Sequence, residues 1–456
     1  MKAALEYTEK HFEKAVDQLI EWLKIPSIST DPAYQDEMKR GIEWISQYMQ
    51  SIGLENVKIL PTEGHPLVYA DWLHAGEDAP TVLIYGHYDV QPAEIADGWD
   101  HDPFQPEVRD GKIFARGATD DKGQCMIQMK AIEALLASQS CPVNVKYLIE
   151  GEEEIGSINL TKFIEENKAL LEADVAVISD TGMRGENSPS MVYGLRGLVT
   201  LEILLSGPSR DLHSGGYGGI LLNPAQAIAE IVAQLHDKNG RVTVPGFYDD
   251  VASLTEKELT MLKQGDFTDE EWQNLMGDLE EWGESGFSRI EKLSTRPTLE
   301  VNGISGGYTG EGFKTVIPAK AKAKISCRLV PNQDPQDVLQ KLKDYILSIK
   351  PAGVHLDFKE YGHCAAALAE LDHPATQAAI EAFKAEWPDQ ELLLLRGGGS
   401  IPVVADIQNI FEIPVILLGF GLPDSQAHGP NESFYLSQYK KGIKTVIHYF
   451  HQLAAS

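Results

Sequence analysis

Cysteine is scarce in this sequence, and the few cysteines present are scattered. Cys125, Cys141, Cys327 and Cys364 form no C-x-x-C pair. This argues against a disulfide-stabilised scaffold and against a zinc site built from thiolates, and it indicates buried free thiols. Any metal bound by this chain would therefore need oxygen and imidazole ligands.

Basic residues are also in the minority, with 39 lysines and arginines against 68 aspartates and glutamates and a formal net charge of −29. A chain this acidic repels phosphate backbones and anionic membranes, so we expect neither a nucleic-acid partner nor a membrane partner. The acidic excess fits a strongly solvated surface and also fits a need for carboxylates in a metal site. Both explanations can hold together.

Long hydrophobic runs are missing as well. No apolar stretch approaches the roughly 18 residues that a membrane-spanning helix needs. Residues 1–25 are too charged for a signal peptide and have the spacing of an amphipathic helix, with Phe12, Val16, Ile20 and Leu23 on one face. We therefore expect a soluble, cytoplasmic protein that is not exported.

The order of the expected elements predicts an α/β fold with an insertion. Strand-like and helix-like segments alternate up to about residue 180 and again after residue 364, which is typical of a sheet covered by helices. Between them the pattern changes to antiparallel strands with a few helices. We predict one α/β domain, residues 1–193 and 364–456, interrupted by an inserted α+β domain, residues 194–363. The acidic stretch 254–285 is interpreted as a helical surface insertion.

The apolar run in "VLIYGHYDVQP" is expected to be a buried strand that ends at Gly86 and delivers His87 and Asp89. Residues i and i+2 of a strand face the same side, so the carboxylate can orient the imidazole toward a metal. Taken alone, the pair is better explained by a simple hydrogen bond at the end of a strand.

Further acidic clusters follow the neighbouring segments. "RGATDDKGQ" places Asp120 and Asp121 at a helix start, where a helix cap explains one carboxylate but not two adjacent ones. "LIEGEEEIGS" ends a strand with Glu152 to Glu154, "VAVISDTG" ends another with Asp180, and "DSQAHGPNE" puts His428 in a late loop. Two histidines with surplus carboxylates suit Zn²⁺ or Mn²⁺, and one shared carboxylate is how paired metal sites are held.

These motifs, in this order, resemble the M20 metallopeptidase family, and within it the carnosine-type cytosolic dipeptidases. The matching segments are "GHYDV", "RGATDDKG", "EGEEEIGS", "ISD", "RDLHSG", "KTVIP", "CRLVPN", "GGGSIPV" and "AHGPNE". They span essentially the whole chain. The resemblance implies a catalytic domain with two metal ions and an inserted domain that serves as lid and dimerisation platform.

The resemblance also implies a set of metal ligands. Asp120 would bridge two divalent ions, Zn²⁺ or Mn²⁺. His87 and Asp180 would complete the shell of one ion, and Glu154 and His428 that of the other. A cis peptide between Asp120 and the next residue is expected from the same source.

The catalytic roles implied by the resemblance fall on Glu153 as general base and Asp89 as the group that orients His87. A slip of one position in the alignment of "EEIGS" would make Glu152 the base instead. The intact Glu153 and Asp89 argue against a metal-stabilised binding protein without catalysis, because a binder needs no base.

The activity implied is hydrolysis of dipeptides or short peptides at the bond before a free C-terminal carboxylate. By the resemblance, His213 from the partner subunit of a homodimer would stabilise the oxyanion, although the sequence alone favours a surface loop histidine. Arg328 is either an edge-strand arginine with its head in water or the group that binds the carboxylate, with help from Ser400 and the amides of residues 397–399. Thr315 is a further substrate-binding candidate. An N-acyl-amino-acid deacylase or a carboxypeptidase of the same family would need the same metal site, so these alternatives stay open.

Overall fold

The chain folds as two units, one of them inserted into the other. The computed structural model describes residues 1–456. The first unit comprises Met1–Tyr193, Ala369–Leu395 and Val403–Ser456, and the second comprises Gly194–Leu368 and Arg396–Pro402. The sequence placed residues 364–368 and 396–402 with the first domain. They join the second unit because Ala367 pairs with Leu195, and because the backbone of Arg196 donates to the carbonyl of Gly399.

A mixed six-stranded sheet in the order β1-β2-β6-β3-β7-β17 forms the centre of the first unit. Strands β6, β3, β7 and β17 run parallel to one another, whereas β1 and β2 are antiparallel to their neighbours. The strands are β1 (Glu55–Leu60), β2 (Leu67–Trp72), β3 (Thr81–His87), β6 (Asn144–Glu150), β7 (Val175–Ile178) and β17 (Val415–Leu417). The predicted mixed α/β fold class is confirmed.

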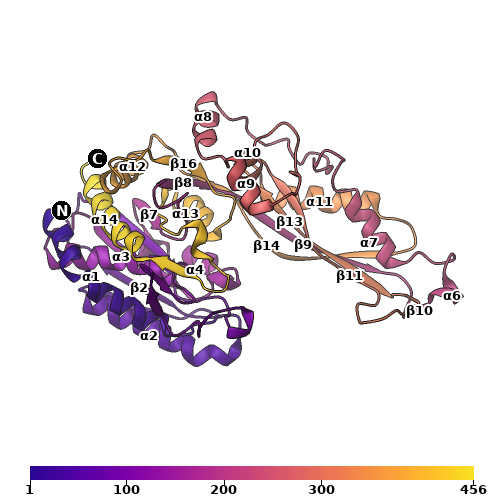
Figure 1. The fold of residues 1–456 in the computed structure, drawn as a ribbon, viewed down its shortest axis with the longest axis horizontal. Helices are drawn as coiled ribbons and strands as arrows, with labels where there is room; N and C mark the ends of the chain where they lie inside the picture. Colours follow the sequence, from indigo (N-terminus) through magenta and orange to yellow (C-terminus); the bar gives the residue numbers. More distant parts are fainter. The chain divides into compact units, whose positions relative to one another are not determined.

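Helices from both ends of the first unit's sequence pack beside this sheet (Figure 1). Helix α3 contacts α1, α14 and strand β3, and α14 contacts α12. The helices are α1 (Lys2–Leu23), α2 (Gln35–Ser51), α3 (Lys122–Ala137), α4 (Leu160–Glu166), α5 (Lys168–Leu171), α12 (Pro374–Glu386), α13 (Pro402–Phe411) and α14 (Leu436–Leu453). Residue Asn167 separates the two short helices α4 and α5.

A small antiparallel sheet, β18-β5-β4, completes the first unit and will matter for the site. It consists of β4 (Glu107–Arg109), β5 (Lys112–Phe114) and β18 (Ser433–Tyr435). The pairing of Ser433 with Phe114 brings a late segment of the chain next to the residues that precede α3.

The second unit is built on an antiparallel sheet in the order β11-β13-β9-β14. Its main strands are β9 (Gly197–Ser206), β11 (Thr298–Gly306), β13 (Lys320–Leu329) and β14 (His355–Cys364). Shorter strands are β10 (Leu212–His213), β12 (Val316–Ile317) and β15 (Ala367–Leu368), whereas β8 (Ser190–Leu195) and β16 (Leu393–Arg396) begin in the first unit and end in the second. Its helices are α6 (Ser214–Tyr217), α7 (Pro224–Ala233), α8 (Glu256–Gln264), α9 (Asp269–Met276), α10 (Arg289–Ser294) and α11 (Pro335–Ile349). The acidic stretch does contain short helices, α8 and α9.

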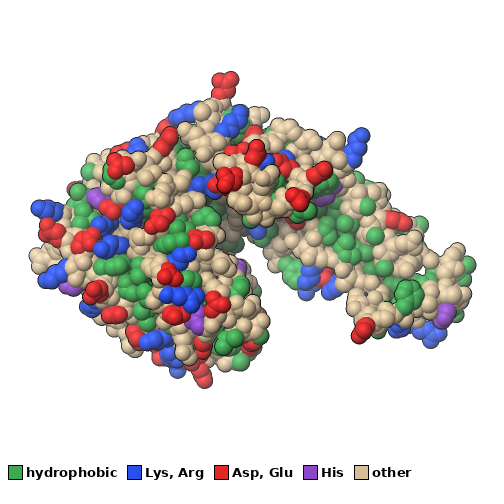
Figure 2. Space-filling model, in the orientation of Figure 1, with side chains coloured by type: hydrophobic (Ala, Val, Ile, Leu, Met, Phe, Trp, Pro, Cys, Tyr) green, Lys and Arg blue, Asp and Glu red, His purple; other side chains and the backbone are tan.

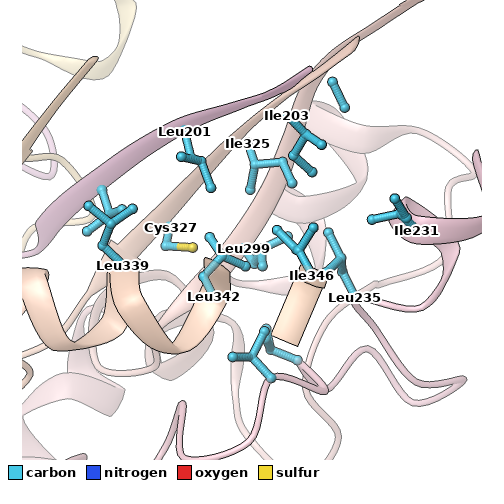
Figure 3. Packing of buried hydrophobic residues seen from close by; sticks show 14 of the residues in the cluster. Leu201, Ile203, Ile231, Leu235, Leu299, Ile325, Cys327, Leu339, Leu342 and Ile346 are labelled. Atoms are coloured by element: carbon cyan, nitrogen blue, oxygen red, sulfur yellow. The ribbon is translucent and has the colours of Figure 1, made fainter. Parts of the chain in front are cut away.

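One face of this sheet is buried by α7 and α11. Along β13 buried and more exposed residues alternate, so that Ile325 and Cys327 point inward while lysines point outward. Figure 3 shows these two side chains meeting Leu342 and Ile346 of α11. The inward-facing residues of the strand, at every second position, and the apolar stripe of the helix are therefore buried in the same core.

The surface is charged, and none of the helices has the length and apolar character needed to cross a bilayer. Acidic and basic side chains are interspersed over the visible face of each unit (Figure 2).

The packing of α11 generates a stability prediction. Leu342 is fully buried, whereas Leu347 on the same helix is 49% exposed. Leu342→Ala should lower the free energy of unfolding of the second unit by about 2–5 kcal/mol, because it leaves a cavity among well-packed side chains. Leu347→Ala should change it by less than about 0.5 kcal/mol. Hydrogen exchange of β9 and β13 peptides, followed by mass spectrometry, measures both, and equal effects would contradict this packing.

Candidate metal centre

Three neighbouring strands end at the same edge of the central sheet and carry polar residues there. Strands β6, β3 and β7 are parallel, so their carboxyl ends lie together. His87 is the last residue of β3, Glu152 to Glu154 follow β6, and Asp180 follows β7. This edge is where α/β sheets place their binding sites.

The sequence predicted that strand β3 ends at Gly86, but the strand continues through His87. Gly86 is required for close packing instead. A Cβ at this position would lie 2.2 Å from the Sγ of Cys125 on α3, which is closer than atoms can approach. The glycine therefore lets α3 approach the end of β3, and the residues just before α3 lie at the same sheet edge.

The carboxylate of Asp120 lies between two imidazoles. Its Oδ1 is 3.3 Å from the Nε2 of His87, and its Oδ2 is 2.9 Å from the Nε2 of His428. The same nitrogen of His428 is 3.2 Å from Glu154 Oε2. Residues more than 300 positions apart in sequence thus meet at one carboxylate. The peptide bond between Asp120 and Asp121 is cis, as expected.

Two groups of potential ligands share Asp120. One consists of His87, Asp120 and Asp180, and the other of Asp120, Glu154 and His428, with the ligand atoms of each group within 4.8 Å of one another. The Nε2 of His87 and the Oε1 of Glu154 are buried and have no hydrogen-bond partner. Buried polar atoms are normally satisfied, and an imidazole–carboxylate donor set suits zinc or manganese. The residues therefore fit a pair of divalent ions.

The electrostatics of the cluster point the same way. Burial, reinforced by the charge of Asp120, raises the pKa of Asp180 well above its ordinary value. Burial likewise raises the pKa of Glu153 to about 7, although His87 opposes the shift. Hydrogen bonds to Asp120 and Glu154 raise the pKa of His428 to about 10. So many carboxylates close together retain their charge only when cations balance them.

Asp89 holds the ring of His87 through two groups. The backbone oxygen of Asp89 is 3.1 Å from His87 Nδ1, and its carboxylate Oδ1 is 3.4 Å from the same nitrogen. The other carboxylate oxygen accepts hydrogen bonds from Ser29 Oγ at 2.7 Å and from the amide of Glu154 at 3.1 Å. An imidazole held at Nδ1 in this way presents Nε2 to a metal.

The neighbouring glutamates Glu152 and Glu153 have different environments. The carboxylate of Glu152 accepts hydrogen bonds from the amide of His65 and from Asn159 Nδ2, at 2.9 and 2.8 Å. It approaches Gly64 so closely that a Cβ there would lie 1.7 Å from its Oε1. The carboxylate of Glu153 instead interacts electrostatically with His87, Glu154 and Asp120.

The predicted substrate-binding residues all lie in the second unit. His213 is exposed, its Nδ1 accepts from the amide of Gly215, and its Nε2 is 3.4 Å from Thr315 Oγ1. Arg328 Nη1 donates to Ser400 Oγ at 2.7 Å, and Ser400 in turn donates to the carbonyl of Arg196 at 2.5 Å. The structure thus brings these four residues together in two pairs.

Several residues in these networks were not singled out from the sequence. Arg196 binds the glycine loop through Nε, which donates to Gly398 O at 2.9 Å. Gln91 Nε2 donates to Glu154 Oε2 at 2.8 Å. Gln91 directly follows the recognised motif "GHYDV", so a polar residue flanking a motif was the available signal there, whereas Arg196 adjoins no recognised motif. Ser29 lies far from any motif and left no such signal.

Comparison with known proteins gives a consistent result. A family model described as peptidase family M20/M25/M40 matches residues 83–452. The Cys-Gly metallodipeptidase dug1 of Schizosaccharomyces pombe is 34% identical over 99% of this chain and 98% of its own length.

Two solved structures are similar over nearly the whole chain. The M20 family metallo-carboxypeptidase Sso-CP2 from Sulfolobus solfataricus has a TM-score of 0.88 and 34% identity, covering 97% of this chain and 99% of that one. Human carnosine dipeptidase 1 has a TM-score of 0.84 and 30% identity, covering 100% and 99%. Together with the family model, these likenesses show that the chain belongs to peptidase family M20/M25/M40.

Proposed function

We propose that this protein is a metallodipeptidase that hydrolyses the peptide bond of dipeptides or short peptides with a free C-terminal carboxylate. The observation that carries the proposal is the pair of ligand groups that share Asp120. Membership of a peptidase family and likeness to a Cys-Gly metallodipeptidase support the choice of reaction. A cytoplasmic location stays a prediction.

The proposed cofactors are two divalent ions, zinc or manganese. Asp120 would be shared, His87 and Asp180 would complete one shell, and Glu154 and His428 the other. When bound, such ions polarise the peptide carbonyl and lower the pKa of water, which brings hydrolysis within reach at neutral pH. Asp89 keeps the ring of His87 oriented for this task through its two contacts with Nδ1.

Glu153 is the proposed general base. Its carboxylate accepts the proton of the water that attacks the peptide carbonyl and then donates it to the leaving amine. The raised pKa, about 7, suits a group that must both take and give a proton near neutrality. Glu152 is less suited, because a backbone amide and Asn159 already occupy its oxygens.

The substrate carboxylate is proposed to bind Arg328 and Ser400, with Thr315 as a further contact. The environment of Arg196 supports this choice. Burial and the charge of Arg328 lower the pKa of Arg196 to about 10. Two guanidinium groups that repel one another make a favourable place for an anion. In this proposal the second unit serves as lid and dimerisation platform.

His213 is proposed to stabilise the oxyanion in the site of the partner subunit of a homodimer. Its exposed imidazole adjoins Thr315, another predicted substrate contact. An imidazole N–H aimed at a developing oxyanion is a common catalytic device.

The likeness to a metallo-carboxypeptidase favours carboxypeptidase activity as a second candidate. A panel of Ala-Ala, Ala-Ala-Ala and N-acetyl-alanine distinguishes the possibilities. We expect Ala-Ala to be hydrolysed fastest. Faster hydrolysis of the tripeptide would favour the carboxypeptidase, and turnover of N-acetyl-alanine alone would favour a deacylase.

Metal dependence follows from the proposed ligands. Prolonged treatment with a chelator should abolish hydrolysis of Ala-Ala, because the shared carboxylate and its imidazoles would lose their ions. Adding Zn²⁺ or Mn²⁺ after removal of the chelator should restore it, and the metal that restores more activity identifies the better cofactor. Activity that persists in a metal-free sample would contradict the two-ion proposal.

The base is tested by two neighbouring substitutions. Glu153→Gln should lower kcat by about 10²- to 10⁴-fold, because an amide cannot accept the proton, while metal content stays near that of the wild type. Glu152→Gln is the matched control and should retain most of the activity. Steady-state kinetics on Ala-Ala with metal analysis measures both, and the reverse pattern would make Glu152 the base.

The proposed shared site is tested by mixing two inactive variants, His213→Ala and Glu153→Gln, under conditions that let subunits exchange. If His213 acts across the interface, each mixed dimer has one site with both defects and one intact site. Activity should then return to as much as about half of the wild-type value per mixed dimer, from site counting in a two-fold assembly.

If His213 acted within its own chain, every site of the mixed dimer would keep one defect. No activity would return. Absence of recovery despite proven exchange, or a purely monomeric protein in solution, would disprove the shared site.

A further inference from the structure

Glu432 is a buried carboxylate that no catalytic role accounts for. It is fully buried and directly precedes β18. Its backbone carbonyl accepts a hydrogen bond from the amide of Ala115, so the pairing of β18 with β5 extends to it. The side chain is thereby placed beneath the loop that leads from β5 to Asp120.

The carboxylate of Glu432 accepts four hydrogen bonds from that loop. Oε1 accepts from the amides of Thr119 and Asp120, at 2.8 and 3.0 Å. Oε2 accepts from the amide of Gly117 at 3.0 Å and from Arg116 Nη1 at 2.6 Å. The amide of Asp120 belongs to the residue whose side chain the two ligand groups share, so Glu432 fixes that residue's backbone.

Arg116 extends the same network to a second ligand. Its Nη1 is used by Glu432, and its Nη2 donates to the backbone carbonyl of His428 at 3.1 Å. His428 has a left-handed backbone with φ of 62°, which a residue other than glycine adopts only when its surroundings impose it. The hydrogen bond from Arg116 is one such constraint, because it acts directly on the backbone carbonyl of His428.

A buried ion pair can be purely structural, and it is a weak argument for stability because desolvation offsets the attraction. The Arg116–Glu432 pair differs from a generic pair in what it binds. Its remaining hydrogen bonds go to the backbone of Asp120 and of His428, whose side-chain atoms approach to 2.9 Å. The pair therefore links the two loops that supply these groups.

We infer that Glu432 and Arg116 are positioning residues that hold Asp120 and His428 at the spacing needed to bind the metal pair. This inference rests on the proposed function, since it assigns a role in supporting the same centre. Residues that orient metal ligands from behind typically affect metal affinity or activity by about 10- to 100-fold when replaced.

The test is Mn²⁺ binding by the full chain after removal of metal, with free Mn²⁺ measured by electron paramagnetic resonance. Glu432→Gln keeps the size of the side chain, but its NH₂ group must face two donors. We expect both binding steps to weaken by about 10- to 100-fold, because Asp120 belongs to both ligand groups. Unchanged dissociation constants would overturn the inference.

Glu133→Gln is the matched control. Glu133 is also a buried carboxylate of the first unit, with hydrogen bonds from Lys130 Nζ, Tyr48 and Tyr7. This substitution should lower the thermal midpoint as a structural defect does and leave Mn²⁺ affinity unchanged. If Glu133→Gln lost as much Mn²⁺ affinity, general destabilisation would explain the effect of Glu432→Gln as well, and the inference would be overturned.

Arg116→Lys provides an independent variant should Glu432→Gln fail to fold. Lysine keeps the charge beside Glu432 but cannot also reach the carbonyl of His428 with a planar fork. We expect one binding step to weaken more than the other, because His428 belongs to only one ligand group. Two unchanged steps would overturn the inference, whereas a wild-type protein that binds neither Mn²⁺ nor Zn²⁺ would overturn the proposed metal centre itself.

Discussion

The first unit depends on one arrangement, a single carboxylate placed between two imidazoles. Each oxygen of Asp120 faces a histidine, one from the end of β3 and one from the loop before β18. Asp180, Glu153 and Glu154 lie in the same cluster, and burial pushes the pKa of the first two upward. Such a cluster is unfavourable by itself, because like charges repel and burial disfavours them. The surrounding fold must therefore supply the free energy that keeps these groups together.

That free energy comes from hydrogen bonds to the candidate ligands and to the residues that contact them. The donors lie in segments far apart in sequence. Ser29 from the N-terminal segment holds Asp89, which holds His87. Gln91 holds Glu154. The parallel pairing of β3 with β6 and β7 sets where these chains end, and α3 can approach only because Gly86 has no side chain. The central sheet fixes the approximate positions of the ligands, and the polar contacts behind them fix their directions.

Much of this centre could be predicted from the sequence, because its ligands follow strands that are themselves conspicuous. An apolar run followed by a polar residue, as in "VLIYGH" and "VAVISD", identifies both the strand and the candidate ligand. What could not be predicted depends on tertiary proximity. Gly86 does not end the strand. A glycine is needed there because any side chain would collide with Cys125, a residue of another element. The assignment of residues 396–402 to the second unit and the contact of Ser29 with Asp89 are likewise set by partners distant in sequence.

The division of labour between the two units explains why the metal ligands are easier to infer than the substrate. All residues of both ligand groups come from the first unit, whereas His213, Thr315, Arg328 and Ser400 come from the second. A chain can therefore vary the second unit without disturbing the ligands, and similar proteins do include both dipeptidases and a metallo-carboxypeptidase. Family membership consequently constrains the reaction more strongly than the peptide that is cleaved. In the proposed function the substrate carboxylate binds the second unit, where Arg196 holds the glycine loop and Arg328 donates to Ser400.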